Sequence, residues 1–313
     1  MKVFCFLLLI LVIAGLELCA QVPHVVSGNI VRHENFASAF VPSRHIDVWL
    51  PEGYTTSKKY AVLYMQDGQM LYDKSITWNN QAWDVDDVAT RLLKEGKVKD
   101  FIIVGIWNNG AKRRAEYFPQ KPFESLTAAE KEFVGQQLIA RDLSNLKFES
   151  NADNYLRFLV KELKPFIDSA YATIPNKANT FIAGSSMGGL ISMYAICEYP
   201  KIFGAAACMS THWPGIFSIN NNPVPGAFLR YLQNNLPAPE THRFYFDCGD
   251  ATLDSLYPPL QKKVDLVMKL HRYNSNNWIT SYFTGGVAHA EEDWNFRLHH
   301  PLLFLLGKAS TSK

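Results

Sequence analysis

The stretch from Phe181 to Leu190, Phe-Ile-Ala-Gly-Ser-Ser-Met-Gly-Gly-Leu, decides the fold, because an apolar run passes directly into the pattern Gly-x-Ser-x-Gly. The apolar run predicts a buried β-strand, and the residues after Ser186 predict a helix. Small residues on both sides of Ser186 allow the tight strand-to-helix turn on which a nucleophilic serine projects above a parallel sheet. The backbone N–H of Met187, at the helix start, can face a developing oxyanion. We therefore predict Ser186 as a nucleophile and Met187 as a backbone oxyanion donor.

Apolar runs of the same kind recur along the chain and predict six buried strands. They span residues 60–65, 101–107, 179–184, 204–210, 243–248 and 278–283. Helical patterns lie between them, at 83–93, at 154–171, after Ser186, at 259–273 and at 294–306. This alternation predicts an α/β fold whose mostly parallel central sheet carries helices on both faces. Residues 111–151, charged and poor in strand signals, predict a small helical cap, and residues 21–313 predict a single domain.

The composition of the 313 residues is that of a folded protein, with 48% hydrophobic and 19% charged residues. The formal net charge is only +2, far from the basic excess that binding to a phosphate backbone needs, so we expect no nucleic-acid partner. The chain contains neither a Cys-x-x-Cys pair nor a His-Glu-x-x-His pattern, and we expect no metal and no cofactor. The oligomeric state has no signal in the sequence.

The first twenty residues predict a secretory signal peptide. One lysine precedes an apolar run that is too short to span a bilayer comfortably and that ends at Leu-Cys-Ala20. Cleavage after Ala20 would export the chain to the periplasm or the extracellular space, without stable membrane insertion. A retained N-terminal anchor is the alternative, and the leucine before Cys19 disfavours lipid attachment there. The later cysteines, Cys197, Cys208 and Cys248, lie in apolar segments and predict buried core residues rather than disulfides.

A serine nucleophile needs a general base, and the base needs an acid that orients it. His289 follows the last predicted strand and a glycine pair, in a loop at the carboxyl end of the sheet from which a base could reach Ser186. The loop after residues 243–248 offers Asp254 as the acid, with Asp250 as the alternative. We therefore predict that Ser186, His289 and Asp254 are the catalytic residues.

Residues near other predicted strand ends are candidates for binding. The second oxyanion donor is expected after residues 60–65, where Gly68 lets the backbone turn and direct the N–H of Gln69 toward the site; an ordinary β-turn is the alternative. His212 follows a strand and is placed to line the cleft. The tryptophans near the predicted cleft could stack on sugar or aromatic rings, or pack under the cap instead. They are Trp78, Trp83, Trp107 and Trp213.

Several segments together resemble the esterase D-like family of α/β-hydrolases, which includes enterochelin esterases, feruloyl esterases, S-formylglutathione hydrolase and the antigen 85 mycolyltransferases. The resemblance rests on VLYMQDGQMLYD (62–73), IIVGIWNNGAKRRAEYFP (102–119), IAGSSMGGLISMYAICEYPKIFGAAACMS (182–210), FDCGDATLDSLY (246–257) and GGVAHAEEDWNFRL (285–298). It implies an α/β-hydrolase fold and the same three catalytic residues. It also implies that Arg114 and Glu116 help shape the cleft, whereas the residues alone suggest a solvated charge pair. The chain lacks the HGGG-type oxyanion segment of other hydrolases.

The function that the resemblance implies is that of a serine esterase with an acyl-enzyme intermediate. We expect the substrate to be a carbohydrate-linked feruloyl or acetyl ester, because export suits an extracellular polymer. A siderophore trilactone of the enterochelin type is the alternative substrate, and the sequence does not distinguish hydrolysis from acyl transfer to an alcohol. A hydrolase scaffold that has lost catalysis and serves as a binding module is the alternative from a different class.

Overall fold

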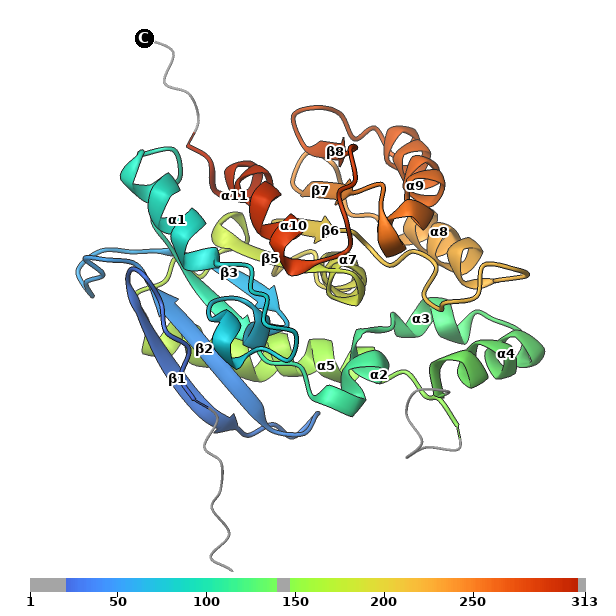
Figure 1. Cartoon of the computed structure of the whole chain (residues 1–313), viewed down its shortest axis with the longest axis horizontal. Helices are drawn as coiled ribbons and strands as arrows, with labels where there is room; N and C mark the ends of the chain where they lie inside the picture. Colours follow the sequence, from blue (N-terminus) through green and yellow to red (C-terminus); the bar gives the residue numbers. More distant parts are fainter. Residues whose placement is uncertain (1–20, 140–146, 309–313) are drawn as a thin grey trace, which may run out of the picture.

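A central sheet of parallel strands, extended at one edge by two antiparallel strands, organises the computed structural model, which describes residues 21–139 and 147–308 (Figure 1). The strand order is β1-β2-β4-β3-β5-β6-β7-β8. The antiparallel edge consists of β1 (Asn29–Phe36) and β2 (Arg44–Leu50). The parallel strands are β4 (Phe101–Ile106), β3 (Ala61–Gln66), β5 (Thr180–Ser185), β6 (Ala205–Met209), β7 (Arg243–Cys248) and β8 (Trp278–Tyr282). The predicted signal peptide, residues 1–20, lies outside the described residues.

The six strands that the apolar runs predict are all present. Strands β3, β4, β5 and β6 are buried along their whole length, as expected of parallel strands covered on both faces. Strand β8 was also predicted to be buried, and that prediction was wrong: it is partly exposed, because it pairs only with β7 and forms the second edge of the sheet.

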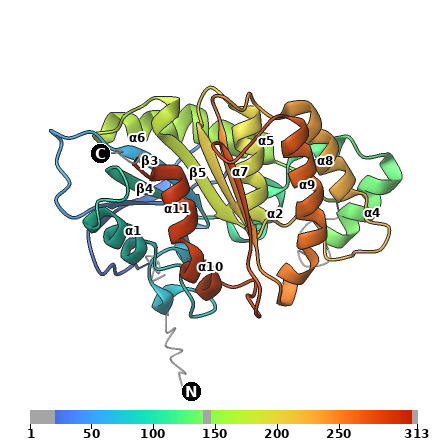
Figure 2. The same ribbon diagram turned by 90° about the horizontal axis from the view of Figure 1, so that it is seen from above.

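Helices cover both faces of the sheet, as Figure 2 shows. The helices α1 (Val85–Lys94), α10 (Glu291–Arg297) and α11 (His299–Leu306) pack on the face that includes Leu63 of β3. The neighbouring Tyr64 points to the opposite face, since side chains alternate along a strand. That face carries α5 (Ala152–Phe158), α6 (Lys164–Ala170), α7 (Met187–Glu198), α8 (Val224–Asn235) and α9 (Pro258–Leu270), with a π-helical turn, Leu159–Leu163, between α5 and α6. The mixed α/β architecture is therefore confirmed, although α8 was not predicted.

The predicted cap region is helical where it is described. It contains α2 (Arg113–Tyr117), α3 (Gln120–Glu124) and α4 (Ala128–Ile139), which follow β4 and lie beside α8 and α5 (Figure 1). Short 3-10 turns complete the connections: Gly68–Met70, Lys74–Ile76, Gly110–Lys112, Lys177–Asn179 and Thr252–Leu256. None of the helices in the described part of the chain combines the length and the hydrophobicity that crossing a membrane requires.

The carboxyl ends of the parallel strands meet at one edge of the sheet, which is where open α/β sheets place their ligands. The loops after β3, β5, β6 and β7 therefore converge there, and they carry most of the candidate residues. The three later cysteines lie in α7, β6 and β7. Cys197, Cys208 and Cys248 are free and buried, which confirms their prediction as core residues.

Candidate active site

Ser186 forms the turn between β5 and α7 in a backbone conformation that side chains rarely adopt, with φ 57° and ψ −122°. Its N–H donates to the carbonyl of Met209 at 3.0 Å, which ties the turn to β6. The turn needs glycine before it, because a Cβ at Gly184 would come within 2.7 Å of the backbone of Gly188. Ser186 is half-buried while its neighbours on both sides are buried, so the packing leaves the serine as the accessible residue of the turn.

His289 and Asp254 meet in the loops that follow β8 and β7. The Nδ1 atom of His289 lies 2.6 Å from Oδ1 of Asp254, and the imidazole is 14% exposed while the carboxylate is fully buried. The second carboxylate oxygen accepts hydrogen bonds from Ser210 Oγ at 2.5 Å and from the Gly249 N–H at 2.7 Å. Burial alone would raise the pKa of Asp254, but the contact with His289 and these hydrogen bonds outweigh it and lower the pKa. This carboxylate is thus held in its ionised form against an imidazole.

Asp250, the alternative acid, binds backbone N–H groups instead of the imidazole. Its carboxylate accepts the backbone N–H groups of Gly285, Gly286 and Val287 at 2.9 to 3.0 Å. These three hydrogen bonds hold the loop that leads to His289. Of the two aspartates that the sequence left open, the structure brings Asp254 to the imidazole and Asp250 to the backbone of the loop.

His212 was predicted to line the cleft, and this prediction is corrected because the residue is only 3% exposed. It packs against the backbone of the nucleophile and is bonded to a tyrosine that the sequence analysis did not identify. The backbone N–H of His212 donates to the carbonyl of Ser186 at 3.2 Å, and its Nδ1 lies 2.8 Å from the hydroxyl of Tyr257. Burial lowers the pKa of His212 to about 3, so its imidazole is neutral. Burial raises the pKa of Tyr257, and a hydrogen bond with Ser186 offsets part of that rise. Tyr257 also stacks edge-on against His289, with ring centroids 5.7 Å apart, and so belongs to the same cluster.

The predicted oxyanion donors lie in two elements beside Ser186. Met187 is the first residue of α7, where the N–H groups have no acceptor within the helix. Gln69 lies in the 3-10 turn after β3, half-buried between two buried residues. That turn presses against β4, since a Cβ at Gly68 would lie 2.6 Å from the backbone of Gly105. The side chain of Gln69 accepts the backbone N–H of Asn108 at 3.1 Å, which fixes the turn further.

An aspartate–arginine pair holds the start of the same turn. Asp67 has a left-handed φ of 57° and accepts two hydrogen bonds from Arg113, through Nε and Nη2, both at 2.7 Å. Asn108 donates a third hydrogen bond to the same carboxylate, also at 2.7 Å. Both oxygens of Asp67 are therefore occupied, and the backbone that carries Gln69 is held in a conformation that aspartate tolerates better than most residues.

The predicted ring-stacking tryptophans differ in their surroundings. Trp213 is only 2% exposed and donates to Gln261 at 2.7 Å, so a substrate ring cannot reach it and its prediction as a binding residue is corrected. The indole N–H of Trp107 donates to buried Asp47 at 2.7 Å, and its ring is stacked under Arg32, so this residue is anchored within the protein. Trp78 is 83% exposed.

Trp78 stands next to a contact with the histidine loop. The adjacent Asn79 donates to Glu291 at 2.8 Å, two residues after His289. The indole of Trp78 is therefore presented to solvent from a loop that is fastened to the loop of His289. Trp83, from the same group, is buried against Trp294 with ring centroids 5.3 Å apart.

Arg114 and Glu116 do not form a solvated charge pair, and this part of the prediction was wrong. Glu116 is buried and forms a two-armed ion pair with Arg44, whose Nη1 and Nη2 atoms each lie 2.8 Å from a carboxylate oxygen. Arg114 donates to the carbonyl of Leu138 at 3.0 Å and lies over the ring of Phe217. The partner of Glu116 is 72 residues away in the sequence, which no local pattern could reveal.

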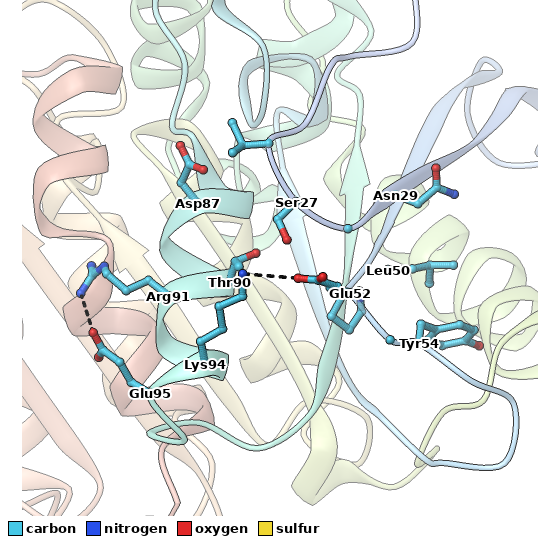
Figure 3. Close-up of a pocket in the computed structure, with 14 residues that line it drawn as sticks. Ser27, Asn29, Leu50, Glu52, Tyr54, Asp87, Thr90, Arg91, Lys94 and Glu95 are labelled. Carbon is cyan, nitrogen blue, oxygen red and sulfur yellow. Dashed lines mark ion pairs between the residues drawn. The ribbon is translucent and has the colours of Figure 1, made fainter.

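A large hollow lies near the amino ends of the parallel strands, opposite the carboxyl ends that carry Ser186. It measures about 1030 Å³, is open to solvent and is lined by Leu50, Glu52, Asp87, Lys94 and nearby residues of β2 and α1 (Figure 3). Because β2 runs antiparallel to β4, Leu50 lies at the amino end of the parallel strands. Two ion pairs lie among the charges that line the hollow, Lys94 with Glu52 at 3.3 Å and Arg91 with Glu95 at 4.0 Å. This hollow is separate from the cluster around Ser186.

Within residues 21–139 and 147–308, no three histidine, cysteine, aspartate or glutamate side chains gather in an arrangement that could hold a metal ion. The cluster around Ser186 offers an accessible serine, an imidazole paired with a carboxylate, and backbone donors.

Comparisons with known proteins add a sequence family to this geometry. Residues 38–305 match the model of the family described as "Putative esterase". The chain is 25% identical over 173 residues to the uncharacterized protein YbbA of Bacillus subtilis, covering 55% of this chain and 58% of that protein. It is 25% identical over 240 residues to an endo-1,4-beta-xylanase/feruloyl esterase of Xylanibacter ruminicola, covering 71% of this chain and 25% of that protein. The matches thus span little more than half of the first relative and a quarter of the second.

Solved structures share the fold at lower identity. A ferulic acid esterase superimposes with a TM-score of 0.62 at 20% identity, covering 90% of this chain and 98% of the other. The enterobactin esterase of Shigella flexneri, in the presence of 2,3-di-hydroxy-N-benzoyl-glycine, gives a TM-score of 0.61 at 18% identity, covering 92% of this chain and 61% of the other. At these identities the likeness establishes the α/β-hydrolase fold and nothing finer.

Proposed function

The chain belongs to the family described as "Putative esterase", and from that premise we propose that it hydrolyses carboxylic esters through an acyl-enzyme on Ser186. One observation carries the proposal. An accessible serine in a strained turn shares the carboxyl edge of the sheet with an imidazole whose Nδ1 is paired, at 2.6 Å, with a buried carboxylate. This is the set of groups that nucleophilic catalysis by a serine requires, because the hydroxyl is a weak nucleophile without an oriented base.

The reaction starts when Nε2 of His289 takes the proton of Ser186 as Oγ attacks the ester carbonyl. The carbonyl electron pair moves onto oxygen, where the N–H groups of Met187 and Gln69 would bind the oxyanion. As the tetrahedral intermediate collapses, the imidazolium returns its proton to the leaving alcohol. A water molecule then attacks the acyl-enzyme by the same route and releases the acid. Asp254 holds Nδ1–H throughout, which fixes the tautomer and stabilises the imidazolium.

For the substrate we propose a feruloyl or acetyl ester linked to carbohydrate. The exposed indole of Trp78, on a loop fastened to the His289 loop, offers a flat apolar surface of the kind that binds sugar or aromatic rings. The relative from Xylanibacter ruminicola, named as a xylanase and feruloyl esterase, supports the same choice. A siderophore trilactone is the second candidate, favoured by the shared fold with the Shigella flexneri enterobactin esterase. Initial rates with feruloylated xylo-oligosaccharide and with a catecholate trilactone decide between them.

Export is part of the proposal. The lysine, the apolar run and the Leu-Cys-Ala20 ending would direct the chain to the periplasm or beyond, with cleavage after Ala20. N-terminal sequencing of the protein recovered outside the cytoplasm should begin at Gln21. An intact N-terminus at Met1 in that fraction would contradict cleavage.

The test of the activity compares two adjacent serines. Ser186→Ala should abolish turnover of 4-nitrophenyl acetate and covalent labelling by a fluorophosphonate. Ser185→Ala is the matched control, because Ser185 is buried at the end of β5 and should leave turnover within about twofold. If Ser186→Ala keeps the wild-type rate, the proposed mechanism is wrong. If the wild type shows neither turnover nor labelling, the fold serves as a binding module instead.

A further inference from the structure

A buried arginine stands behind the Asp254–His289 pair and is not used by the mechanism above. Arg297, at the end of α10, is 0% exposed. Its Nη2 donates to Ser210 Oγ at 2.6 Å and lies 3.5 Å from Oδ2 of Asp254. Its Nε lies 3.3 Å from Oδ2 of Asp247, and the ring of Phe283 covers one face of the guanidinium. A positive charge so deep in the protein needs compensation, and the two aspartates provide it.

The hydroxyl of Ser210 connects this arginine to the acid. Its oxygen accepts two hydrogen bonds, from Arg297 Nη2 at 2.6 Å and from Trp294 Nε1 at 3.0 Å. A serine hydroxyl has two lone pairs and one proton. Because both lone pairs are occupied, the proton has one remaining partner, Oδ2 of Asp254 at 2.5 Å. Trp294 and Arg297 thus determine the direction of the Ser210 proton.

The direction of the Ser210 proton determines which oxygen of Asp254 is left to accept a hydrogen bond from His289. Oδ2 of Asp254 is occupied by Ser210 and by the Gly249 N–H, so Oδ1 is left for Nδ1 of His289. Ser210 also keeps the arginine from occupying the carboxylate directly. Without the positive charge of Arg297, which lies against both Asp247 and Asp254, these two buried carboxylates would favour protonation of one of them. A protonated Asp254 would be a weaker acceptor for the Nδ1–H and would carry no charge to stabilise the imidazolium.

We propose that Arg297 is a positioning residue for the reaction: acting through the Ser210 hydroxyl, it fixes Asp254 as an ionised acceptor for His289. The proposal rests on the proposed esterase function. Misplacement of a catalytic group by about 1 Å costs on the order of 100-fold in rate. Ser210→Ala and Arg297→Met should therefore each lower kcat for 4-nitrophenyl acetate by about 10- to 100-fold, with KM within about twofold. Arg297→Lys, which keeps the charge and loses the planar fork, should retain more activity than Arg297→Met.

The double variant tests whether the arginine acts through the serine. If it does, Ser210→Ala combined with Arg297→Met should be no more than about threefold slower than the slower single variant. Multiplied effects, or a kcat that Arg297→Met leaves unchanged, would overturn the proposal. Ser186→Ala, measured alongside, separates the two ideas. If Ser186→Ala loses turnover while Arg297→Met keeps a normal kcat, only the positioning role of Arg297 is disproved. If Ser186→Ala retains turnover, the proposed esterase mechanism itself is wrong.

A spectroscopic readout and a control exclude a merely structural effect. The proton between His289 and Asp254 should give a low-field NMR resonance in the wild type, and this resonance should shift or vanish in Ser210→Ala and in Arg297→Met. Arg243→Met is the control, because Arg243 bonds the carbonyls of Phe304 and Leu305 at the far edge of the sheet. It should lower Tm while leaving kcat and the resonance as in the wild type. A resonance that stays in place in both test variants contradicts the proposal.

Discussion

The two sides of Ser186 each hold an aspartate–arginine pair, and the pairs use the arginine differently. On the base side, which follows β7, Arg297 reaches Asp254 through Ser210 and stays 3.5 Å from the carboxylate. On the loop side, which follows β3, Arg113 binds Asp67 directly through two nitrogens at 2.7 Å. The base-side pair is fully buried, whereas the Arg113 and Asp67 side chains are 28% and 12% exposed.

The difference separates a carboxylate that can act from one that holds structure. On the loop side both oxygens of Asp67 accept hydrogen bonds from Arg113 or Asn108, so this carboxylate serves to hold the turn in place. On the base side the arginine is kept one hydroxyl away, and an oxygen of Asp254 remains for His289. We infer that changes to the base-side aspartate alter proton transfer directly. Changes to the Asp67–Arg113 pair act on chemistry only through the turn that carries Gln69, and they alter mainly stability and binding.

The largest expected effect comes from exchanging each aspartate for asparagine. Asp254→Asn should lower kcat by about 10³- to 10⁴-fold, because an amide donates to Nδ1 and holds the imidazole in the wrong tautomer. Asp67→Asn should leave kcat within about tenfold. The measurement is kcat for 4-nitrophenyl acetate with each variant at a concentration fixed by fluorophosphonate titration. A greater loss in Asp67→Asn than in Asp254→Asn would reverse the comparison.

The next largest effect is a fall in the free energy of unfolding at acid pH, which tests whether water is excluded from the base side. The pKa of His212 is lowered by burial to about 3, against 6.5 for an unburied histidine. Between these values the unfolded chain binds a proton that the folded chain does not, so the free energy of unfolding falls as pH drops from 6.5 toward 3. The loss should amount to a few kcal/mol, at about 1.4 kcal/mol for each unit of the pKa difference.

The matched variants are His212→Asn and His24→Asn. Asparagine keeps an acceptor for the Tyr257 hydroxyl but cannot titrate, so His212→Asn should flatten urea-unfolding stability between pH 6.5 and 4. His24 is exposed, and His24→Asn should follow the wild-type curve. Parallel curves for all three proteins would mean that water reaches His212 and that the base side is not dry.

The sequence predicts a residue of these two sides well when its partners are close in the sequence, and poorly when they lie on distant loops. Ser186 was predictable because a strand, a turn and a helix follow one another within ten residues. Chain order reduced the acid to two aspartates, but the choice depended on Asp250 binding the backbone of residues 285–287, which is contact between distant loops. Ser210 and Arg297 are 87 residues apart and have no local pattern that connects them.

The corrected predictions have the same cause. Trp213 follows a strand as a cleft residue would, yet its side chain turns into the core to bond Gln261, 48 residues later. The sequence of β8 is apolar enough to predict a buried strand. It is partly exposed because it is the last strand of the sheet and has a neighbour on one side only. Helix α8 did have a local signal, since Val224, Ala227, Phe228 and Tyr231 recur at helical spacing and are all buried.

The loop-side ion pair should contribute an intermediate amount to stability. Asp67→Asn and Arg113→Met should each lower the free energy of unfolding by about 1–3 kcal/mol, the range of hydrogen bonds to charged groups. Their double variant should be less destabilised than the sum of the two. The control pair is Lys58 and Asp100, which are 51% and 42% exposed at 2.7 Å and should be coupled by less than about 1 kcal/mol. Urea unfolding measures the stability of each single and double variant. Equal coupling energies in the Asp67–Arg113 and Lys58–Asp100 pairs would show that the loop-side pair has no special structural role.

The smallest expected effect concerns substrate binding by the loop side. Trp78→Ala should raise KM for a feruloylated oligosaccharide by about two- to tenfold, which corresponds to the roughly 0.5–1.5 kcal/mol of an aromatic contact. The kcat for 4-nitrophenyl acetate should stay unchanged, because Trp78 makes no contact with Asp254 or His289 and this ester carries no sugar for it to bind. Leu270→Ala removes a similarly exposed apolar side chain at the end of α9 and should change neither value. A KM that Trp78→Ala leaves unaltered would limit the loop side to holding Asp67 and its turn, because Trp78 is the 83% exposed ring whose neighbour Asn79 bonds Glu291 of the histidine loop.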